Sequence, residues 1–489
     1  MGENKRLREL VRRLDGDKLI MKIEACETIA VSSITADSRQ VNEGTLFICK
    51  GFGFKKDYLL SAVEKGAVCC LSEEFYEDVD IPCIQVRDVR KASSLAARWF
   101  YDEPETQMTL VGITGTKGKT SAANILKHIF DTASPRKTAL LSTGRVDTVA
   151  NQYDTHLTTP EPVELQQYFH EAAEAGCHQV VMEVSSQAMK MNRVYGVRFD
   201  YGIFLNVGED HVGGREHPTL EDYVECKTDF MGLCKTAVIN RHTDHFSLAR
   251  DKAKAAGARC IVYGYDEDCD VQIRNVCSDS RGMRFELNYQ GFWYTFATNL
   301  IGAFNVDNLA AAIIVALEAG VSVGVIAQAV EHIHIPGRML VIPVKDFHVV
   351  VDYAHNHLSF LKLYEAVRET FNPNRIHTVF GCPGERSLVR RRDLGSLADQ
   401  FADRIYLTAD DPGYESVEDI CREIQAYLHK ESRIIPDRSE AVRAALDAAE
   451  CGDVVILGGK GAETTQRVAD HYEPYLSDEL VVRQWMDEH

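Results

Sequence analysis

The sequence of 489 residues lacks features that define membrane, secreted or nucleic-acid-binding proteins. Its longest uninterrupted apolar run, residues 309–317, is far shorter than the ~20 residues that span a bilayer. None of the 14 cysteines form a CxxC pair, and the charged start holds no apolar signal stretch, so we expect reduced thiols in a cytoplasmic protein without a membrane span. Lys and Arg number 54 against 73 Asp and Glu, and the net charge of −19 argues against nucleic-acid binding.

The pattern of apolar runs predicts an α/β protein with three domains. At roughly 100–200 residues per domain, the length allows about three of them. Residues 1–107 alternate short apolar runs with helical patterns, which is typical of a small α/β domain. Residues 108–336 predict a parallel sheet followed by antiparallel strands within residues 270–299. Residues 337–489 return to alternating strands and helices, which indicates a doubly wound, Rossmann-like domain.

The most informative motif is GITGTKGKTS at residues 112–121, between a predicted strand and an amphipathic helix. A glycine loop that enters a helix offers backbone N–H groups and the positive end of the helix dipole to phosphate. Lys119 can reach terminal phosphates, and the Thr120 hydroxyl can bind Mg²⁺. The strict P-loop spacing is not met, because Ile113 stands five residues before Gly118. We predict ATP or GTP binding rather than a plain surface turn, by Gly115, Thr116, Lys117, Gly118, Lys119, Thr120 and Ser121.

Further motifs in order along the whole chain resemble the Mur ligase family. They are DSR (37–39), LTTPE (157–161), MEVSS (182–186), EDYVECK (221–227), GAFNVDN (302–308), PGRM (336–339), VDYAH (351–355), DDPG (410–413) and GKGAE (459–463). The resemblance implies a UDP-binding first domain, a central P-loop-type ATPase domain and a third domain that binds the incoming amino acid. It implies ATP-dependent amide formation through an acyl phosphate, in which L-lysine is added to UDP-N-acetylmuramoyl-L-alanyl-D-glutamate during peptidoglycan precursor synthesis.

Metal ligation is partly readable from the residues. Glu183 ends an apolar strand beside the predicted phosphate loop, which suits Mg²⁺ rather than a solvated strand end. The resemblance assigns His211 to a second Mg²⁺. It also makes Lys227 a carbamylated lysine, in which CO₂ turns an amine into an anionic oxygen ligand, although a helical lysine is ordinarily solvated. The implied catalytic set is Lys119, Glu183, His211 and Lys227, and the implied metal ligands are Thr120, Glu183, His211 and carbamylated Lys227.

Ligand contacts elsewhere follow from the resemblance alone. Residues implied to contact ATP, besides the glycine loop, are Asn305, Arg338 and Asp352. Residues implied to bind the UDP-muramoyl dipeptide are Ser38, Thr158, Thr159, Ser185 and Arg193. Met191 departs from the family pattern, because other members can carry a glutamine there.

The third domain carries the predicted specificity for the added amino acid. The resemblance implies that Arg386 grips the α-carboxylate, and a guanidinium can bind a carboxylate with two hydrogen bonds. Members that add diaminopimelate have an arginine at the position of Gly413, which suits the second carboxylate of that substrate. An acidic pocket without this arginine favours an amino acid with a distal ammonium. We expect this pocket to comprise Asp410, Asp411, Pro412, Gly413 and Glu463. The alternative for the two aspartates is a turn that only caps a helix.

Other functions stay open at this point. L-Ornithine differs from lysine by one methylene, which a pocket separates only about 10–200-fold. A folylpolyglutamate synthase-like ligase would add glutamate, which an acidic pocket disfavours. A nucleotide-binding relic without turnover is the third alternative. We expect a monomer that binds ATP, two Mg²⁺, the UDP-muramoyl dipeptide and L-lysine.

Overall fold

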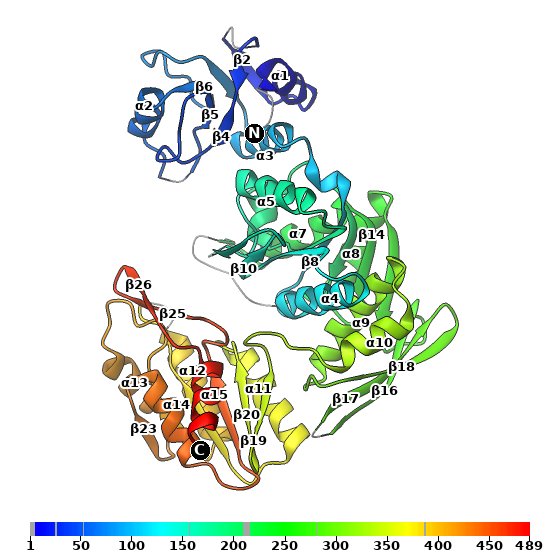
Figure 1. The fold of residues 1–489 in the computed structure, drawn as a ribbon, viewed down its shortest axis with the longest axis vertical. Helices are drawn as coiled ribbons and strands as arrows, with labels where there is room; N and C mark the ends of the chain where they lie inside the picture. Colours follow the sequence, from blue (N-terminus) through cyan, green and yellow to red (C-terminus); the bar gives the residue numbers. More distant parts are fainter. Residues whose placement is uncertain are drawn as a thin grey trace. The chain divides into compact units, whose positions relative to one another are not determined.

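The computed structural model describes residues 5–24, 27–51, 53–155, 157–208, 216–279, 281–385 and 388–489. The chain forms two compact units, one of residues 1–270 with 311–321 and the other of residues 271–310 with 322–489. Each unit contains α/β layers (Figure 1). Among the described residues, no helix combines the length and the apolar content needed to cross a bilayer.

The N-terminal part of the first unit is a five-stranded sheet with the order β2-β7-β6-β5-β4. Neighbouring strands from β4 to β7 are parallel, and β2 runs antiparallel to β7. Apolar residues of α1 and α3 pack together in one core cluster with the sheet, and those of α2 pack in another. The elements are α1 (Leu7–Gly16), β2 (Ile20–Ile23), β4 (Ser33–Thr35), β5 (Thr45–Ile48), α2 (Lys56–Glu64), β6 (Ala67–Ser72), β7 (Cys83–Val86) and α3 (Val89–Phe100), with a small pair of strands β1 (Lys5–Arg6) and β3 (Ala30–Val31).

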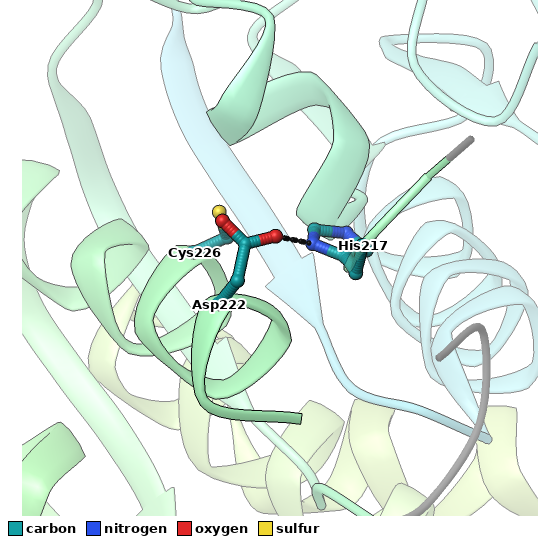
Figure 2. Close-up of side chains that lie close together, drawn as sticks. All are labelled: His217, Asp222 and Cys226. Atoms are coloured by element: carbon teal, nitrogen blue, oxygen red, sulfur yellow. Dashed lines mark hydrogen bonds and ion pairs between the residues drawn. The ribbon is translucent and has the colours of Figure 1, made fainter. Parts of the chain in front are cut away.

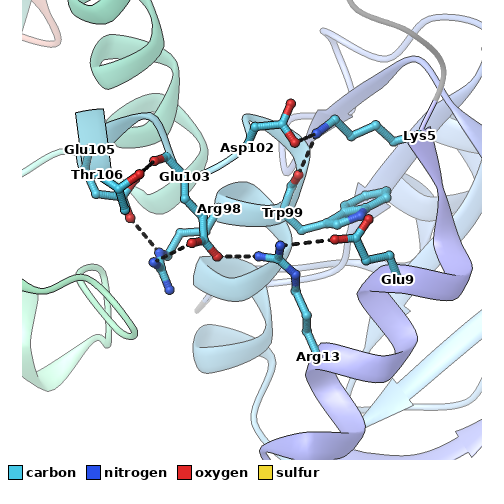
Figure 3. Close-up of polar contacts among 9 residues, drawn as sticks. All are labelled: Lys5, Glu9, Arg13, Arg98, Trp99, Asp102, Glu103, Glu105 and Thr106. Carbon is cyan, nitrogen blue, oxygen red and sulfur yellow. Dashed lines mark hydrogen bonds and ion pairs between the residues drawn. The ribbon is translucent and has the colours of Figure 1, made fainter. Parts of the chain in front are cut away.

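The linker after α3 is held by a chain of ion pairs (Figure 3). Glu103 pairs with Arg13 of α1 and, at 3.4 Å, with Arg98 of α3. Arg98 also donates from Nε to Glu105 at 2.7 Å, and Glu105 is only 3% exposed. This network ties the segment containing η1 (Pro104–Gln107) to the two helices that precede it.

The central sheet of the first unit contains the predicted phosphate loop. The strand order is β11-β10-β9-β12-β8-β13-β14-β15. The strands β9, β12, β8, β13, β14 and β15 are parallel, whereas β10 runs antiparallel to both of its neighbours, β9 and β11. The strands are β8 (Thr109–Thr114), β9 (Thr138–Ser142), β10 (Gly144–Asp147), β11 (Gln152–Thr155), β12 (Gln179–Glu183), β13 (Phe199–Phe204), β14 (Cys234–Asn240) and β15 (Arg259–Gly264). The helices are α4 (Lys119–Ala133), α5 (Pro162–Glu174), α6 (Ser186–Lys190), α7 (Leu220–Asp229), η2 (Phe230–Leu233) and α8 (Phe246–Ala255).

The second unit begins with the antiparallel strands expected within residues 270–299. These are β16 (Val271–Asp279), β17 (Gly282–Tyr289) and β18 (Phe292–Thr298). Helix α9 (Phe304–Glu318) starts in this unit, its residues from 311 onward belong to the first unit, and α10 (Val323–Glu331) follows. An Arg274 guanidinium stacks on Trp293, 3.4 Å from the ring centre.

The remainder of the second unit is a six-stranded sheet with the order β19-β20-β24-β21-β22-β23. All neighbours are parallel except β19 and β20. Helices α11 to α13 supply one core cluster and helices α14 and α15 supply another, as in a doubly wound fold. The elements are β19 (Leu340–Val344), β20 (Phe347–Asp352), α11 (His357–Phe371), β21 (Ile376–Phe380), α12 (Leu388–Phe401), β22 (Arg404–Leu407), α13 (Val417–Gln425), β23 (Ser432–Ile434), α14 (Arg438–Asp447), β24 (Val454–Gly458), β25 (Thr465–Val468), β26 (His471–Pro474) and α15 (Asp478–Glu488).

The predicted α/β class and the mixed sheets are confirmed. The hairpin of β25 and β26 and the antiparallel strand β19 are additions that the apolar pattern did not indicate. The division at residues 107 and 336 stays a prediction.

Candidate active site

The loop between β8 and α4 is held from the neighbouring strand β13. Asn206, two residues beyond that strand, accepts the N–H of Thr116 at its carbonyl and the N–H of Lys117 at its side-chain oxygen, each at 2.9 Å. Gly118 has a φ of +86° and precedes α4 without capping it by a side chain. The start of α4, at the positive end of its helix dipole, is a typical position for an anion such as phosphate.

Two lysines approach the same loop carbonyl. Lys119 donates from Nζ to the carbonyl oxygen of Gly115 at 2.8 Å, and Lys227 of α7 donates to that oxygen at the same distance. Lys227 is only 2% exposed, so the ordinary expectation of a solvated helical lysine is wrong. Its Nζ also lies 4.8 Å from the ring centre of Tyr223, whose hydroxyl is 2.9 Å from the Thr116 hydroxyl. Helix α7 thus brings Lys227 to the phosphate loop.

Glu183 is a buried carboxylate surrounded by hydroxyl groups. It ends β12, is 1% exposed and accepts the Thr120 hydroxyl at 2.8 Å. Its oxygens also accept the hydroxyl of Ser142 and both the N–H and hydroxyl of Thr143. Within the described part of the chain it has no ion-pair partner. A buried carboxylate without a countercharge, beside a P-loop threonine, fits a divalent cation.

His211, the other expected metal ligand, lies outside the described residues. Ser142, Thr143 and Tyr223 also belong to this site, although the sequence motifs did not single them out. Ser142 ends β9 and Thr143 follows it, so their role depends on the pairing of β9 with β12 rather than on any local motif.

The residues expected to bind the UDP-muramoyl dipeptide meet partly around Glu183. Thr159 donates to the Glu183 carbonyl at 3.0 Å and accepts the Ser185 N–H at 3.0 Å, and Thr158 accepts the Thr143 hydroxyl at 3.1 Å. Ser185 also caps α6 by accepting the N–H of Ala188. Hydroxyl groups of the residues predicted to bind the dipeptide therefore lie next to Glu183, the predicted metal ligand.

Arg193, also predicted to bind the dipeptide, already has partners within the protein. Its Nη1 donates to the Thr159 carbonyl at 3.0 Å, and its Nε lies 2.6 Å from Glu161. Glu161 also pairs at 2.7 Å with Lys50, a cation that the motifs did not indicate. Burial opposes ionisation of Glu161, but Lys50 and Arg193 outweigh it and hold the pKa of this carboxyl below its usual range. Lys50 and Arg193 therefore both stabilise the ionised form of Glu161.

Ser38 lies in the loop after β4. Its carbonyl accepts a hydrogen bond from Lys65 at 2.7 Å, and the neighbouring Asp37 pairs with Arg39 at 2.8 Å. None of the contacts among the described residues joins Ser38 to Thr158 or Thr159. The role of Ser38 stays a prediction.

In the second unit, Asp352 ends β20 and bonds the backbone just before β19 and just after β20. Its Oδ2 accepts the N–H of Met339 and its Oδ1 accepts the N–H of Ala354, each at 2.7 Å. Burial raises the pKa of Asp352, although Arg338 opposes the rise. The Arg338 guanidinium lies 4.5 Å from the ring centre of Tyr353. Asp352 and Arg338, both expected at ATP, therefore belong to one cluster.

Asn305, the third residue expected at ATP, is 2% exposed at the start of α9. Its side-chain nitrogen donates to the Ile301 carbonyl at 2.8 Å, and its oxygen accepts a hydrogen bond from Asn308 at 3.2 Å. These bonds hold the helix start, and a nucleotide contact stays a prediction.

The acidic residues of the predicted pocket lie close to one buried lysine. Lys460, 1% exposed, pairs with Asp411 at 2.8 Å and with Glu463. Burial raises the pKa of Asp410 to about 6, against the lowering influence of Arg438 and Lys460. Burial favours the neutral form of Lys460, but the three carboxylates outweigh it and raise its pKa. The motif GKGAE supplied the signal for Lys460, which the sequence interpretation left unused.

Gly413 occupies a backbone conformation that suits glycine. Its φ is +60°, and an added Cβ would lie 2.8 Å from the Glu385 carboxylate. Glu385 pairs at 2.8 Å with Arg467 of β25. The cap of α13 is Ser416, which accepts the N–H of Asp419, so the interpretation of DDPG as a helix cap is wrong. Arg386 lies outside the described residues.

A further cluster lies beside the candidate site (Figure 2). His217 is fully buried, and its Nδ1 lies 2.6 Å from Asp222 of α7. One atom each of His217, Asp222 and Cys226 lie within 4.8 Å of one another. The sequence interpretation did not single out this group.

The fold and the site define a P-loop-type nucleotide-binding α/β protein with an attached doubly wound sheet. Models of two families match the chain: the Mur ligase middle domain at residues 113–316 and the Mur ligase glutamate ligase domain at residues 337–461. The chain is 38% identical over 457 residues to a UDP-N-acetylmuramoyl-L-alanyl-D-glutamate--L-lysine ligase of Enterococcus faecalis, which covers 92% of this chain and 90% of the relative.

A UDP-N-acetylmuramyl-tripeptide synthetase of Lactobacillus delbrueckii subsp. bulgaricus is 36% identical over 485 residues, with 94% of each chain covered. Among solved structures, a UDP-N-acetylmuramoyl-L-alanyl-D-glutamate--2,6-diaminopimelate ligase is similar with a TM-score of 0.72 and 26% identity, covering 99% of each chain. The chain belongs to the Mur ligase family, whose members are ATP-dependent ligases of peptidoglycan synthesis. The family resemblance found in the motifs is confirmed.

Proposed function

We propose that this protein adds L-lysine to UDP-N-acetylmuramoyl-L-alanyl-D-glutamate, with ATP activating the substrate carboxylate as an acyl phosphate. The observation that carries the proposal is the meeting of Lys119, Glu183 and Lys227 around one phosphate loop at the carboxyl edge of a parallel sheet. Ligands of α/β proteins bind at this edge. The Enterococcus faecalis relative, named as a lysine ligase, supports the choice of amino acid.

The loop residues 115–121 would hold the phosphates of ATP, and Asn305, Arg338 and Asp352 would contact the nucleotide. Glu183 and Thr120 would hold Mg²⁺, with His211 and carbamylated Lys227 completing two metal sites. When bound, Mg²⁺ neutralises charge on the transferred phosphoryl group. The burial of Lys227 beside the loop supports a carbamate, because an anionic oxygen ligand suits a metal where an ammonium repels it.

Ser38, Thr158, Thr159, Ser185 and Arg193 would bind the UDP-muramoyl dipeptide. The hydroxyl groups next to Glu183 support this assignment, because a dipeptide carboxylate bound by them would lie near the proposed Mg²⁺ ligand. Arg193 already pairs with Glu161, so its contribution to dipeptide binding includes orienting the LTTPE segment as well as attracting an anion.

Arg386 would bind the α-carboxylate of lysine, and the pocket of Asp410, Asp411, Pro412, Gly413 and Glu463 would receive its distal ammonium. Three carboxylates and one ammonium leave this pocket with a formal charge of −2 when all are ionised. A second carboxylate, as in diaminopimelate, would be repelled and left without a partner, which costs about 1–3 kcal/mol.

We assign residues 1–107 to the UDP-binding domain, 108–336 to the ATP-binding domain and 337–489 to the amino-acid-binding domain. We propose that the protein acts as a monomer. The proposed substrates, ATP and a UDP-linked precursor, place the reaction in the cytoplasm.

Phosphate release from ATP tests the function, with the UDP-muramoyl dipeptide and either lysine, ornithine, diaminopimelate or glutamate. We expect the highest kcat/KM with lysine and a value about 10–200-fold lower with ornithine. The highest turnover with diaminopimelate would contradict the pocket assignment. Phosphate release only with folate and glutamate would indicate a folylpolyglutamate synthase, and nucleotide binding without any turnover would indicate a relic.

A further inference from the structure

One buried histidine joins two segments of the candidate site. His217 Nδ1 lies 2.6 Å from Asp222 Oδ2 (Figure 2). On the other side of the ring, His217 Nε2 lies 3.0 Å from the Ser186 hydroxyl. Ser186 opens α6 directly after Ser185 and three residues after Glu183, whereas Asp222 lies on α7, five residues before Lys227. His217 therefore connects the segment with Glu183 to the helix with Lys227.

Two further contacts reinforce this connection. Lys190 at the end of α6 pairs with Asp222 at 2.7 Å, which adds a second link between α6 and α7. The His217 ring packs edge-on against Tyr223, with 5.2 Å between the ring centres. The Tyr223 hydroxyl in turn lies 2.9 Å from the hydroxyl of Thr116 in the phosphate loop.

We propose that His217 is a positioning residue for the ligation reaction, because it fixes the segment with Glu183 and Ser185 against the helix with Lys227. The inference rests on the proposed function. Asp222 accepts the Nδ1 hydrogen, so in the neutral ring Nε2 accepts the Ser186 hydroxyl. A small shift of a positioned group has a large effect on a reaction that depends on alignment.

Two other roles fit the cluster less well. His, Asp and Cys are common ligands of zinc, but Asp222 already bonds both the Lys190 ammonium and His217, so a metal ion would meet a cation there. The order Ser–His–Asp is that of hydrolytic triads, but the Ser186 residue is 6% exposed and its hydroxyl is engaged in packing α6 against His217. A hydrogen-bonded connection explains the short distances without either role.

The test uses the full chain and three variants: S186A, which removes only one hydroxyl, H217F, which keeps a ring against Tyr223, and the double variant. A matched control is H377F. His377 is also fully buried and bonds an aspartate, Asp453, at 3.0 Å, but it lies on β21 and contacts no proposed site residue. The readouts are KM for the dipeptide, KM for ATP, the melting temperature, and the dipeptide Kd in the presence of a non-hydrolysable ATP analogue.

We expect S186A and H217F to raise the KM and Kd for the dipeptide about 3- to 10-fold, as for one lost hydrogen bond. The KM for ATP should rise as well, because Glu183 and Lys227 belong to the proposed Mg²⁺–ATP site. The double variant should lose no more than H217F alone, because both single variants remove the same bond. H377F should keep the wild-type KM and Kd for the dipeptide.

Wild-type dipeptide affinity in a folded S186A variant would overturn the proposal even if H217F fails to fold. Losses of dipeptide affinity that multiply in the double variant would overturn the proposal as well. Zinc-dependent stabilisation of the wild type that C226S abolishes would replace it with a metal site. An inactive wild-type chain would instead contradict the proposed function, so the two failures are distinguishable.

Discussion

The Lys460 ammonium lies 2.8 Å from the Asp411 carboxylate, and Lys460 is buried to 1% exposure between the DDPG and GKGAE segments. Two motifs separated by 45 residues thus form one charged cluster. The carboxylates proposed to bind the distal ammonium of the substrate therefore already pair with one ammonium of the protein.

We expect K460M to raise the KM for lysine about tenfold, because Asp411 and Glu463 lose the cation that holds them in place and unpaired buried groups cost about 1–3 kcal/mol. Steady-state kinetics with varied lysine measure the effect. K235M is a suitable control, since Lys235 is 69% exposed in its pair with Asp200. A lower KM in K460M would show that Lys460 competes with the substrate ammonium.

Gly413 offers a test of specificity for the amino acid. We expect G413R to reduce kcat/KM for lysine by at least tenfold, because a side chain here meets Glu385 and requires a positive φ. The added guanidinium should also increase the ratio of diaminopimelate to lysine turnover. G291A is the control, because Gly291 has a φ of +82° but open space around it. An unchanged substrate ratio in folded G413R would refute a role of this position in selectivity.

The raised pKa of Asp410 predicts that the stability of the protein depends on pH. Its folded pKa of about 6 lies above the usual value of 3.8, so the folded state binds the proton more tightly than the unfolded state. This group contributes most stability below about pH 4 and loses that contribution as the pH rises through about 6.

We therefore expect D410N to raise the free energy of unfolding at pH 7 by roughly 1–3 kcal/mol and to make no such difference near pH 4. Urea unfolding at both pH values measures this difference. The exposed D487N variant provides the control. Destabilisation of D410N at pH 7 without a change at pH 4 contradicts the assignment of sign.

Glu183 should be required for turnover but not for folding. We expect E183Q to lower kcat at least about 100-fold, because a neutral amide can still accept hydrogen bonds from Thr120 and Ser142 but cannot neutralise a divalent cation. Phosphate release at increasing Mg²⁺ measures this loss, and E174Q at the exposed end of α5 is the control. Near-normal kcat in E183Q would remove Glu183 from the catalytic set.

Lys227 allows a direct test of the carbamate. We expect K227A to lose activity at least about 100-fold and to regain part of it with a short-chain carboxylic acid, which can supply the missing oxygen ligand. K252A on α8 is the control, because Lys252 forms ion pairs near the surface with Glu225 and Asp229. Loss without rescue at any acid concentration would support a lysine that acts as an ammonium.

The fold class followed from the sequence because apolar strands, helical periodicity and a glycine loop are local signals. The motif at 112–121 predicted strand, loop and helix, and the structure confirms β8, the loop and α4. The order of the strands was not readable, since the position of β24 between β20 and β21 depends on contacts between residues more than 70 positions apart.

The sequence by itself determined the chemical types available at the site: a phosphate loop, carboxylates at strand ends and an acidic DDPG segment. The tertiary structure alone decided that Lys227 is buried, that Glu183 accepts hydroxyls from both α4 and the end of β9, and that Lys460 pairs with Asp411 of the acidic DDPG segment. The reason is physical. Charge and burial at one point depend on every segment that packs there, and segments distant along the chain leave no local pattern that predicts their meeting.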